Sequence, residues 1–196
     1  MEGLRRRDLE PDPLKQFAGW FEDARAAGGR LPEAVALATA TADARPSARM
    51  VLLKGFEPDG FVFYSGYESR KGRELEENPH AALLFYWDAL GRQVRIEGPV
   101  VRVSAAESDA YWASRPLGSR LSAAASEQSA PVGSREELER RVSASAGEPS
   151  RPERWGGYRL APEAYEFWQH RDDRLHDRIA YLPEPGGGWR TQRLAP

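Results

Sequence analysis

The stretch SARMVLLKGFEPDGFVFY, residues 47–64, predicts two β-strands joined by a tight turn. Residues 47–54 and residues 61–64 are rich in the aliphatic, β-branched and aromatic side chains that favour strands. Between them the tetrapeptide EPDG, residues 57–60, has the composition of a β-turn. A connection this short joins antiparallel strands, because a parallel pair needs a long crossover. The stretch therefore indicates an antiparallel sheet.

Further strands are expected on both sides of this stretch. Residues 34–41 and 81–87 are apolar runs of strand length, and residues 92–104 alternate in character and predict two strands broken at Gly98–Pro99. The strands do not alternate steadily with helices as they do in a doubly wound sheet. We therefore expect a mainly β fold with peripheral helices, of the α+β class, built as a small antiparallel barrel. The remaining strands are expected at GYRLA (157–161), AYEFW (164–168), RIAYL (178–182) and WRTQRL (189–194).

Helices are expected at the edges of this sheet. The first begins at Pro13, whose missing N–H costs nothing at that position, with Asp12 as its N-cap. Apolar residues at helical spacing continue until the helix ends near Gly28. Further helices are expected over residues 70–78, 105–115 and 136–146.

Length and composition limit the classes of function. With 196 residues we expect one domain over 1–196, of which 1–11 form a flexible N-terminal segment. Lys and Arg total 28 against 30 Asp and Glu, and the net charge of −2 argues against a general nucleic-acid binder. The absence of cysteine excludes disulfides, thiolate metal sites and iron–sulfur clusters, and no other metal site is predicted. Redox chemistry would therefore require an organic cofactor.

Known targeting and nucleotide-binding motifs are absent. No apolar run approaches the roughly 20 residues that span a bilayer, and no apolar core of a secretory signal follows the first basic residues. We therefore expect a cytoplasmic protein without a membrane partner. Neither GxGxxG after a strand nor GxxxxGK[ST] occurs, so neither a Rossmann nucleotide site nor a P-loop is indicated.

Cations stand at places where a ligand would explain them. In a regular strand Arg49 and Lys54 would point to opposite sides and could bind two different anions, although two solvated strand ends are an equally simple interpretation. Arg70 and Lys71 open the helix expected over residues 70–78, where free N–H groups attract anions. Cations are unfavourable there without an anion, but a solvated first turn needs no ligand. Both interpretations stay open.

Two other polar groups could face a ligand. Gln93 could present a donor and an acceptor to the edge of a heterocycle, or could lie on the exposed face of a sheet. In the segment RLHDR, residues 174–178, an extended backbone would place Arg174, His176 and Arg178 on one face. These three donors repel one another unless an anion lies over them. A neutral His176 would then suit hydrogen bonding beside a ligand.

A third group has the spacing of a helix. Tyr111, Arg115 and Ser119 recur every four residues, and on a continuous helix they would form a row suited to a phosphate monoester. Pro116 and Gly118 interrupt that helix, so the geometry of the row stays open.

These segments occur in one order along nearly the whole chain. Together they closely resemble the pyridoxine/pyridoxamine 5′-phosphate oxidase family, FMN enzymes of the split-barrel fold. The motifs that carry the resemblance are RRRDLEPDPLKQF, RMVLLKGF, GFVFYSGYESRKGRELEENP, FYWDALGRQVRIEG, SDAYWASRP, SEQS, RWGGYRL, EFWQ, RLHDRIAY and RLAP.

The resemblance implies an activity and an assembly. Such enzymes oxidise pyridoxamine 5′-phosphate and pyridoxine 5′-phosphate to pyridoxal 5′-phosphate in vitamin B6 metabolism. They use FMN and O2, and they release hydrogen peroxide and, from the amine, ammonia. The flavin lies at the two-fold interface of a homodimer and contacts residues from both chains, so a homodimer is expected here.

The resemblance also implies roles for individual residues. Arg174 and His176 would be catalytic residues that pack over the substrate ring opposite the flavin. Substrate would be bound by Lys54, Tyr111, Arg115, Ser119, Arg174, Leu175 and His176. FMN would be bound by Arg49, Met50, Val51, Leu52, Leu53, Lys54, Tyr64, Ser65, Arg70, Lys71, Gln93, Gln128, Ser129, Trp168 and Arg178.

Two other functions are alternatives to this oxidase activity. An FMN oxidase of the phenazine-pathway type shares the scaffold but acts on a tricyclic substrate, and the set Lys54, Tyr111, Arg115 and Ser119 speaks against it. A non-catalytic module that binds flavin or pyridoxal phosphate is the other alternative, and the intact segment RLHDR speaks against that one.

Overall fold

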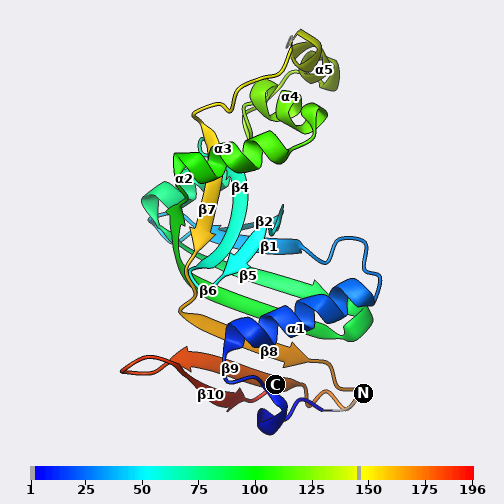
Figure 1. Ribbon diagram of the computed structural model, residues 1–196, viewed down its shortest axis with the longest axis vertical. Coiled ribbons are helices and arrows are strands. Elements are labelled where there is room, and N and C mark those ends of the chain that lie inside the picture. Colours follow the sequence, from blue (N-terminus) through cyan, green and yellow to red (C-terminus); the bar gives the residue numbers. More distant parts are fainter. Residues whose placement is uncertain (1–2, 145–146) are drawn as a thin grey trace.

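The computed structural model describes residues 3–144 and 147–196, in which ten strands form one antiparallel network (Figure 1). Seven strands follow one another in the order β10-β9-β8-β6-β5-β1-β2, while β7 joins β6, and β4 and β3 follow it. The antiparallel, mainly β architecture with peripheral helices is therefore confirmed. The strands are β1 (Ala34–Ala40), β2 (Pro46–Leu52), β3 (Gly55–Glu57), β4 (Gly60–Gly66), β5 (His80–Trp87), β6 (Arg92–Arg102), β7 (Trp155–Leu160), β8 (Ala164–Gln169), β9 (Asp177–Pro183) and β10 (Trp189–Leu194).

The strand β6 connects the two parts of the sheet. Residues 92–97 pair with β5 and β8, whereas residues 100–102 pair with β7. The prediction of two strands broken at Gly98–Pro99 is wrong, because one strand continues through this point. A Cβ atom at Gly98 would lie 1.9 Å from the carbonyl oxygen of Ala161, so glycine permits the close approach of the neighbouring chain there.

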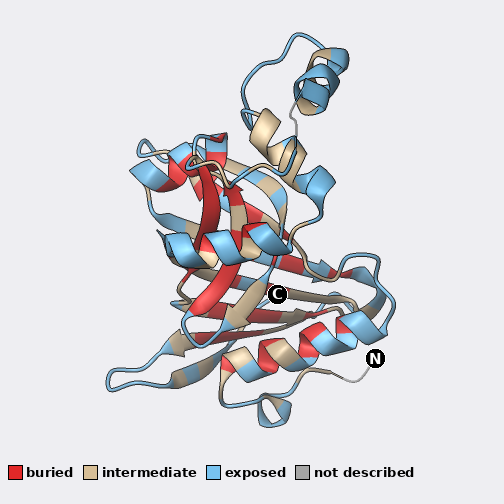
Figure 2. Ribbon diagram, turned by 45° about the horizontal axis from the view of Figure 1, so that its top comes forward, coloured by how far each residue is buried: buried red, intermediate tan, exposed pale blue. Residues whose placement is uncertain are grey.

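The helix α1 (Pro13–Ala26) covers the inner face of the sheet. The Asp12 carboxylate accepts a hydrogen bond from the Leu14 N–H at 2.9 Å, which caps the helix as predicted. Phe17 and Trp20 are buried against aromatic residues of β4, β5 and β8. Figure 2 shows buried residues on the strands and on the side of α1 that faces them. This aromatic packing forms the core that holds the sheet in place.

The remaining helices stand at the other end of the sheet, beside β4 and β7 (Figure 1). The helix α2 (Arg70–Glu77) is capped by Ser69, whose side chain accepts a hydrogen bond from the Gly72 N–H. The expected helix over residues 105–115 is α3 (Ala105–Ser114), and the expected one over 136–146 is α5 (Arg135–Ala144). Residues 145–146 lie outside the described residues. Sequence reasoning missed the helix α4 (Leu117–Ala125), which follows α3 after a break at Arg115–Pro116.

The two ends of the chain meet beside β9 and β10. The Leu4 N–H donates to the Asp177 carboxylate at 3.0 Å, and the Tyr181 hydroxyl donates to the Glu10 carbonyl at 2.7 Å. A short 3-10 helix, η1 (Arg6–Asp8), lies between these contacts. The flexibility of residues 1–11 and the assignment of one domain over 1–196 stay predictions.

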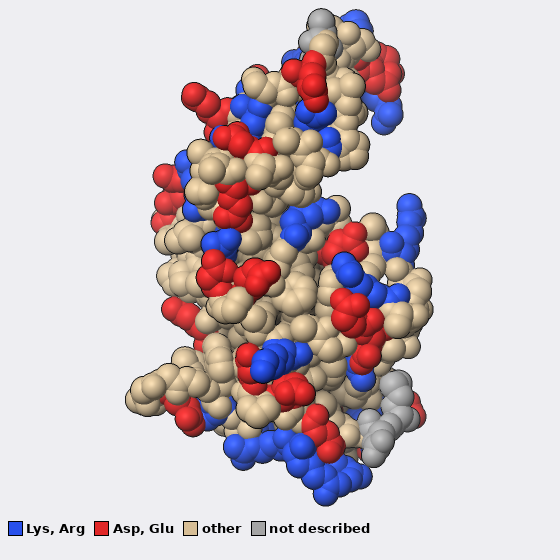
Figure 3. Space-filling view, in the orientation of Figure 1, with Lys and Arg blue, Asp and Glu red and all other residues tan. Residues whose placement is uncertain are grey.

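The surface mixes both signs of charge. In Figure 3 Lys and Arg side chains are interspersed with Asp and Glu. None of the helices within residues 3–144 and 147–196 is long and apolar enough to cross a membrane.

Candidate active site

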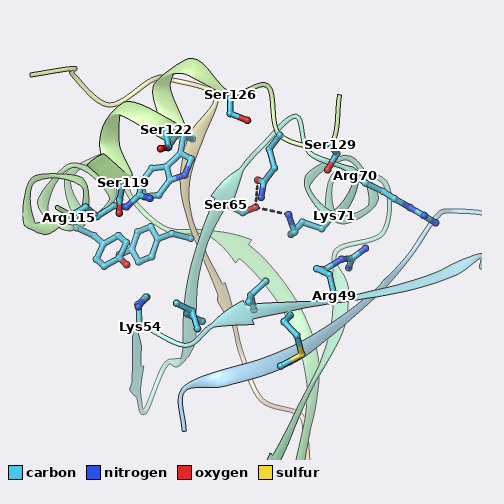
Figure 4. A pocket seen from close by; sticks show the side chains of 18 of the residues that line it. Arg49, Lys54, Ser65, Arg70, Lys71, Arg115, Ser119, Ser122, Ser126 and Ser129 are labelled. Carbon is cyan, nitrogen blue, oxygen red and sulfur yellow. Dashed lines mark hydrogen bonds between the residues drawn. The ribbon is translucent and has the colours of Figure 1, made fainter. Parts of the chain in front are cut away.

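An open cleft of about 1000 Å³ lies between β2 and β4 on one side and α2, α3 and α4 on the other. Figure 4 shows its cations at two separate ends, one near α2 and one near α3. Leu53 is buried in the hydrophobic core, so its side chain lies apart from the cleft. The predicted site residues that line the cleft are Arg49, Met50, Val51, Leu52, Lys54, Tyr64, Ser65, Arg70, Lys71, Tyr111, Arg115, Ser119, Gln128 and Ser129.

A buried carboxylate organises the end near α2. The guanidinium groups of Arg49 and Arg70 lie 3.1 and 2.9 Å from the carboxylate of Glu74, whose side chain is 4% exposed. The hydroxyls of Thr39 and Ser47 donate to the same carboxylate. Burial raises the pKa of Glu74, but the hydrogen bonds from Ser47, Thr39, Arg70 and Arg49 outweigh burial and lower this pKa to about 2. Glu74 is therefore ionised, and it holds two guanidinium groups at the edge of the cleft.

A buried ammonium group completes this end. The Lys71 Nζ donates to the Ser65 hydroxyl at 3.0 Å, and the Ser65 hydroxyl donates to the Gln128 side-chain oxygen at 2.9 Å. Burial, and then the charge of Arg49, lower the pKa of Lys71 to about 8, against an opposing effect of Glu74. A buried cation whose hydrogen-bond partners are neutral gains most from an anionic ligand. The three cations therefore form one anion-binding end of the cleft.

The end near α3 is built on aromatic rings. The rings of Tyr64 and Tyr111 stack with their centroids 3.9 Å apart. Arg115, Lys54 and Ser119 surround them at this end of the cleft (Figure 4). The Nη1 atom of Arg115 is buried and has no hydrogen-bond partner among the described residues. A buried donor without a partner is costly, so this atom marks a second position for an anion.

The course of the backbone decides two points of geometry that the sequence left open. Arg115 has an extended backbone between α3 and α4, so Tyr111, Arg115 and Ser119 do not form a row on one helix. The break in the chain brings all three into the same cleft instead. In a regular strand Arg49 and Lys54 would point to opposite sides, but β2 ends at Leu52 and both side chains line the cleft.

The other predicted FMN residues lie on the outer face of the sheet. Gln93, Trp168 and Arg178 are directly paired across β6, β8 and β9, and they line a separate hollow of about 400 Å³. Gln93 and Arg95 share this face. The Arg178 Nε donates to the Glu166 carboxylate at 2.7 Å. Within one chain, these residues do not reach the cleft between β2 and α4.

The segment 174–178 is part of a strand only from Asp177, where β9 begins. Arg174 has a φ of 67° in the turn before β9, so the extended backbone that would place all three donors on one face is not formed. The Nδ1 of His176 accepts a hydrogen bond from the Arg171 N–H at 3.1 Å, which leaves Nε2 as the nitrogen that carries a proton in the neutral ring. The ring of His176 packs on Trp168, with centroids 4.7 Å apart. Leu175 is exposed beside it.

Sequence reasoning missed several groups of the cleft. Ser122 of α4 and Ser126, the C-cap residue of this helix, line the cleft; Ser122 follows the predicted Ser119 by three residues and Ser126 follows Ser122 by four, and this spacing was the available signal. Trp155 is buried, and it also lines the cleft. Glu74 was also missed. The available signal was weaker: Glu74 follows Arg70 by four residues, a spacing at which two charged side chains of a helix form an ion pair.

Comparison with known proteins identifies relatives along the whole chain. Residues 21–146 match the family described as pyridoxamine 5′-phosphate oxidase, and residues 155–196 match the pyridoxine 5′-phosphate oxidase C-terminal dimerisation region. The pyridoxine/pyridoxamine 5′-phosphate oxidase of Rubrobacter xylanophilus is 58% identical over 99% of this chain and 91% of its own length. That of Paraburkholderia phymatum is also 58% identical, over 96% and 91%.

Solved structures share the fold. PhzG from Burkholderia lata 383, in complex with tetrahydrophenazine-1-carboxylic acid, is 35% identical with a TM-score of 0.91 over 100% of this chain and 99% of that one. A pyridoxamine 5′-phosphate oxidase-related, FMN binding protein from Nostoc punctiforme PCC 73102 has the same fold at 19% identity, with a TM-score of 0.77 over 92% and 97%. With both parts of its sequence matched and over half of its residues identical to such relatives, the chain belongs to the pyridoxine/pyridoxamine 5′-phosphate oxidase family.

Proposed function

We propose that this protein oxidises pyridoxamine 5′-phosphate and pyridoxine 5′-phosphate to pyridoxal 5′-phosphate, with FMN and O2, in the cleft between β2 and α4. The observation that carries this proposal is the presence of two separate cationic ends in one cleft. FMN and the substrate each bring one phosphate group, so two ends are needed when both are bound. The family to which the chain belongs supplies the identity of the reaction.

The end near α2 suits the phosphate of FMN. Among the described residues no carboxylate accepts a hydrogen bond from the buried Lys71, and Arg49 and Arg70 are already held in place by Glu74. Donors that are already held in place bind an anion without the entropy cost of ordering their own side chains. In one protomer FMN would be held by Arg49 to Leu52 of β2, and by Tyr64, Ser65, Arg70, Lys71, Gln128 and Ser129.

The end near α3 suits the phosphate of the substrate. Arg115 offers a buried donor without a partner, and Lys54 and Ser119 lie in the same part of the cleft. Burial raises the pKa of the Tyr111 hydroxyl, so Tyr111 stays protonated at neutral pH and can donate a hydrogen bond. Binding energy from this remote phosphate would hold the reacting carbon in place, so unphosphorylated vitamers should react poorly.

The side chains of the cleft position the reactants. Bound FMN supplies the two-electron oxidation, and O2 takes up the electrons to give hydrogen peroxide. Burial raises the pKa of Tyr64 to about 12, so this residue donates hydrogen bonds and does not act as a base near neutral pH. The residues of this chain thus bind and orient both molecules.

The protein is a homodimer, since residues 155–196 match a dimerisation region. Met50, Leu84 and Tyr86 expose 63%, 39% and 55% of their surface on the outer face of the sheet. Tyr86 is directly paired with Gln93, and Gln93 is paired with Trp168. The exposed apolar residues therefore lie next to the hollow that Gln93 and Trp168 line. An exposed apolar face of this kind favours packing against a second copy.

In this dimer each active site would combine two groups of residues. The cleft of one protomer holds the two cationic ends, and Gln93, Trp168 and Arg178 of its partner would complete the FMN site. Arg174 and His176 of the partner would cover the substrate ring, with the Nε2–H of His176 as a donor. This arrangement explains why these residues lie apart within one chain.

A second candidate is an oxidase that acts on a tricyclic phenazine precursor. The likeness to PhzG, at a TM-score of 0.91, favours it. The identity is higher to the pyridoxine/pyridoxamine 5′-phosphate oxidases, however, at 58% against 35%.

Anaerobic mixing of the FMN-loaded protein with pyridoxamine 5′-phosphate tests the function. An oxidase loses the yellow colour of its flavin, and air restores the colour with formation of peroxide. A flavin carrier or sensor would keep its colour throughout, and that result would contradict the proposal. A phenazine oxidase would bleach only with the tricyclic substrate.

A further inference from the structure

We propose that Trp155 is a positioning residue that holds Arg115 in the orientation needed to bind the substrate phosphate. The inference rests on the proposed function and extends it to the preference for phosphorylated substrates. Trp155 lies at the start of β7, far along the chain from Arg115, and both line the cleft.

The guanidinium group of Arg115 lies over indole rings. Its central carbon is 4.6 Å from the centroid of Trp155 and 5.3 Å from that of Trp112. Its Nη1 is buried without a hydrogen-bond partner, and no carboxylate within residues 3–144 and 147–196 forms an ion pair with it. Cation–π attraction to the two indoles is therefore the main force that orients this side chain.

Trp155 is itself fixed on several sides. Its side chain is buried, and its ring packs edge-on against Trp112, with centroids 4.9 Å apart. The backbone N–H of Trp155 donates to the Pro152 carbonyl at 3.0 Å, and the backbone carbonyl of Trp155 accepts a hydrogen bond from the Arg151 guanidinium group at 2.7 Å. The Trp112 indole N–H donates to the Pro149 carbonyl at 3.0 Å. Two indoles held in this way form a rigid support for the guanidinium group.

The support determines what Arg115 can bind. Burial lowers the pKa of Arg115 from its ordinary value, although the guanidinium group stays charged at neutral pH. A guanidinium group that is shielded from water and forms no ion pair with a carboxylate is strongly stabilised when it binds a phosphate group. Without Trp155 the side chain could turn toward water and would lose this advantage. The loss should then affect only substrates that carry a phosphate.

The experiment compares pyridoxamine 5′-phosphate with unphosphorylated pyridoxamine in steady-state kinetics of the FMN-loaded dimer. Trp155→Leu should raise KM for the phosphorylated substrate roughly tenfold, as expected for loss of a desolvated cation–π contact, with little change in kcat. The constants for pyridoxamine should stay near those of the wild type. Trp155→Phe keeps an aromatic ring and should recover most of the loss. Its kinetics also provide the test if Trp155→Leu does not fold.

Two further variants separate positioning from general damage. Trp87 is equally buried, and its indole N–H donates to the Pro32 carbonyl at 3.0 Å away from the cleft, so Trp87→Leu is a matched control that should leave KM unchanged. In a double-mutant cycle, Trp155→Leu added to Arg115→Met should raise KM no further, because the residue acts through Arg115. Equal losses with both substrates, or additive effects in the cycle, would overturn the inference. Absence of turnover by the wild type would instead refute the proposed function.

Discussion

Lys71 shows at the scale of one residue how burial tunes the proposed FMN site. A lysine next to a serine-rich turn could be noticed in the sequence, but its burial could not. Residues from β1, β2 and β4 converge on α2 only through long-range pairing, so neither the contact with Ser65 nor the effect of Glu74 was predictable. The local sequence thus revealed the unusual position of Lys71, whereas its burial and its contacts became visible only in the fold.

This tuning predicts how the affinity for FMN depends on pH. In the protein without FMN, Lys71 loses its proton as the pH rises through about 8, and a phosphate dianion would raise that pKa. Binding above pH 8 must therefore take up a proton, and Kd should increase by up to about tenfold per pH unit. Fluorescence titration of the protein with FMN from pH 7 to 9.5 measures this change. Lys71→Met should bind more weakly at pH 7 and show no further rise, whereas an unchanged slope in this variant would contradict the assignment.

Lys54 and Arg115 should contribute to substrate binding rather than to the oxidation itself. Removing one charge-assisted contact to phosphate costs about 1.5–3 kcal/mol, so Lys54→Ala and Arg115→Ala should each raise KM by about ten- to a hundredfold. Steady-state kinetics with pyridoxamine 5′-phosphate measure this effect. Normal KM values in both variants would place the substrate phosphate elsewhere.

At the scale of elements, local signals located most strands and helices, and the errors have physical causes. The Asp12 and Ser69 caps act within three residues, so the sequence shows them directly. The course of β6 depends instead on β5, β7 and β8, which let one strand bend at Gly98 without ending. The helix α4 was missed because Pro116 and Gly118 interrupt the pattern, although Pro116 only separates it from α3.

The bend in β6 should tolerate no side chain. A Cβ atom at Gly98 would meet the backbone of Ala161 at 1.9 Å, so Gly98→Ala should lower the free energy of unfolding by about 1–3 kcal/mol. Gly19 of α1 has no atom within 4 Å of such a Cβ, and Gly19→Ala should raise the same quantity by up to about 1 kcal/mol. Urea unfolding of both variants measures these changes. Equal stability of the two would mean that the close approach at Gly98 does not constrain the sheet.

At the scale of the whole molecule, the sequence indicated the ligands but could not place the two halves of the site. The cleft between β2 and α4 and the group at Gln93, Trp168 and Arg178 lie on different parts of one chain. Periodicity places a residue on a face of its own strand, but it carries no information on which face meets a second copy. The match of residues 155–196 to a dimerisation region indicates that the part of the chain that carries Trp168 and Arg178 takes part in the contact between copies.

Subunit complementation tests this composite site most directly. Arg115→Ala damages the cleft of its own protomer, and Arg174→Ala would damage the cover that a protomer gives to its partner. At a concentration of pyridoxamine 5′-phosphate below the wild-type KM, neither homodimer should oxidise this substrate well. After the two variants are unfolded and refolded together, half of the dimers carry one intact site of two, so the mixture should regain about a quarter of the wild-type activity. A mixture no more active than either variant alone would show that each protomer forms its own complete site and would contradict the account.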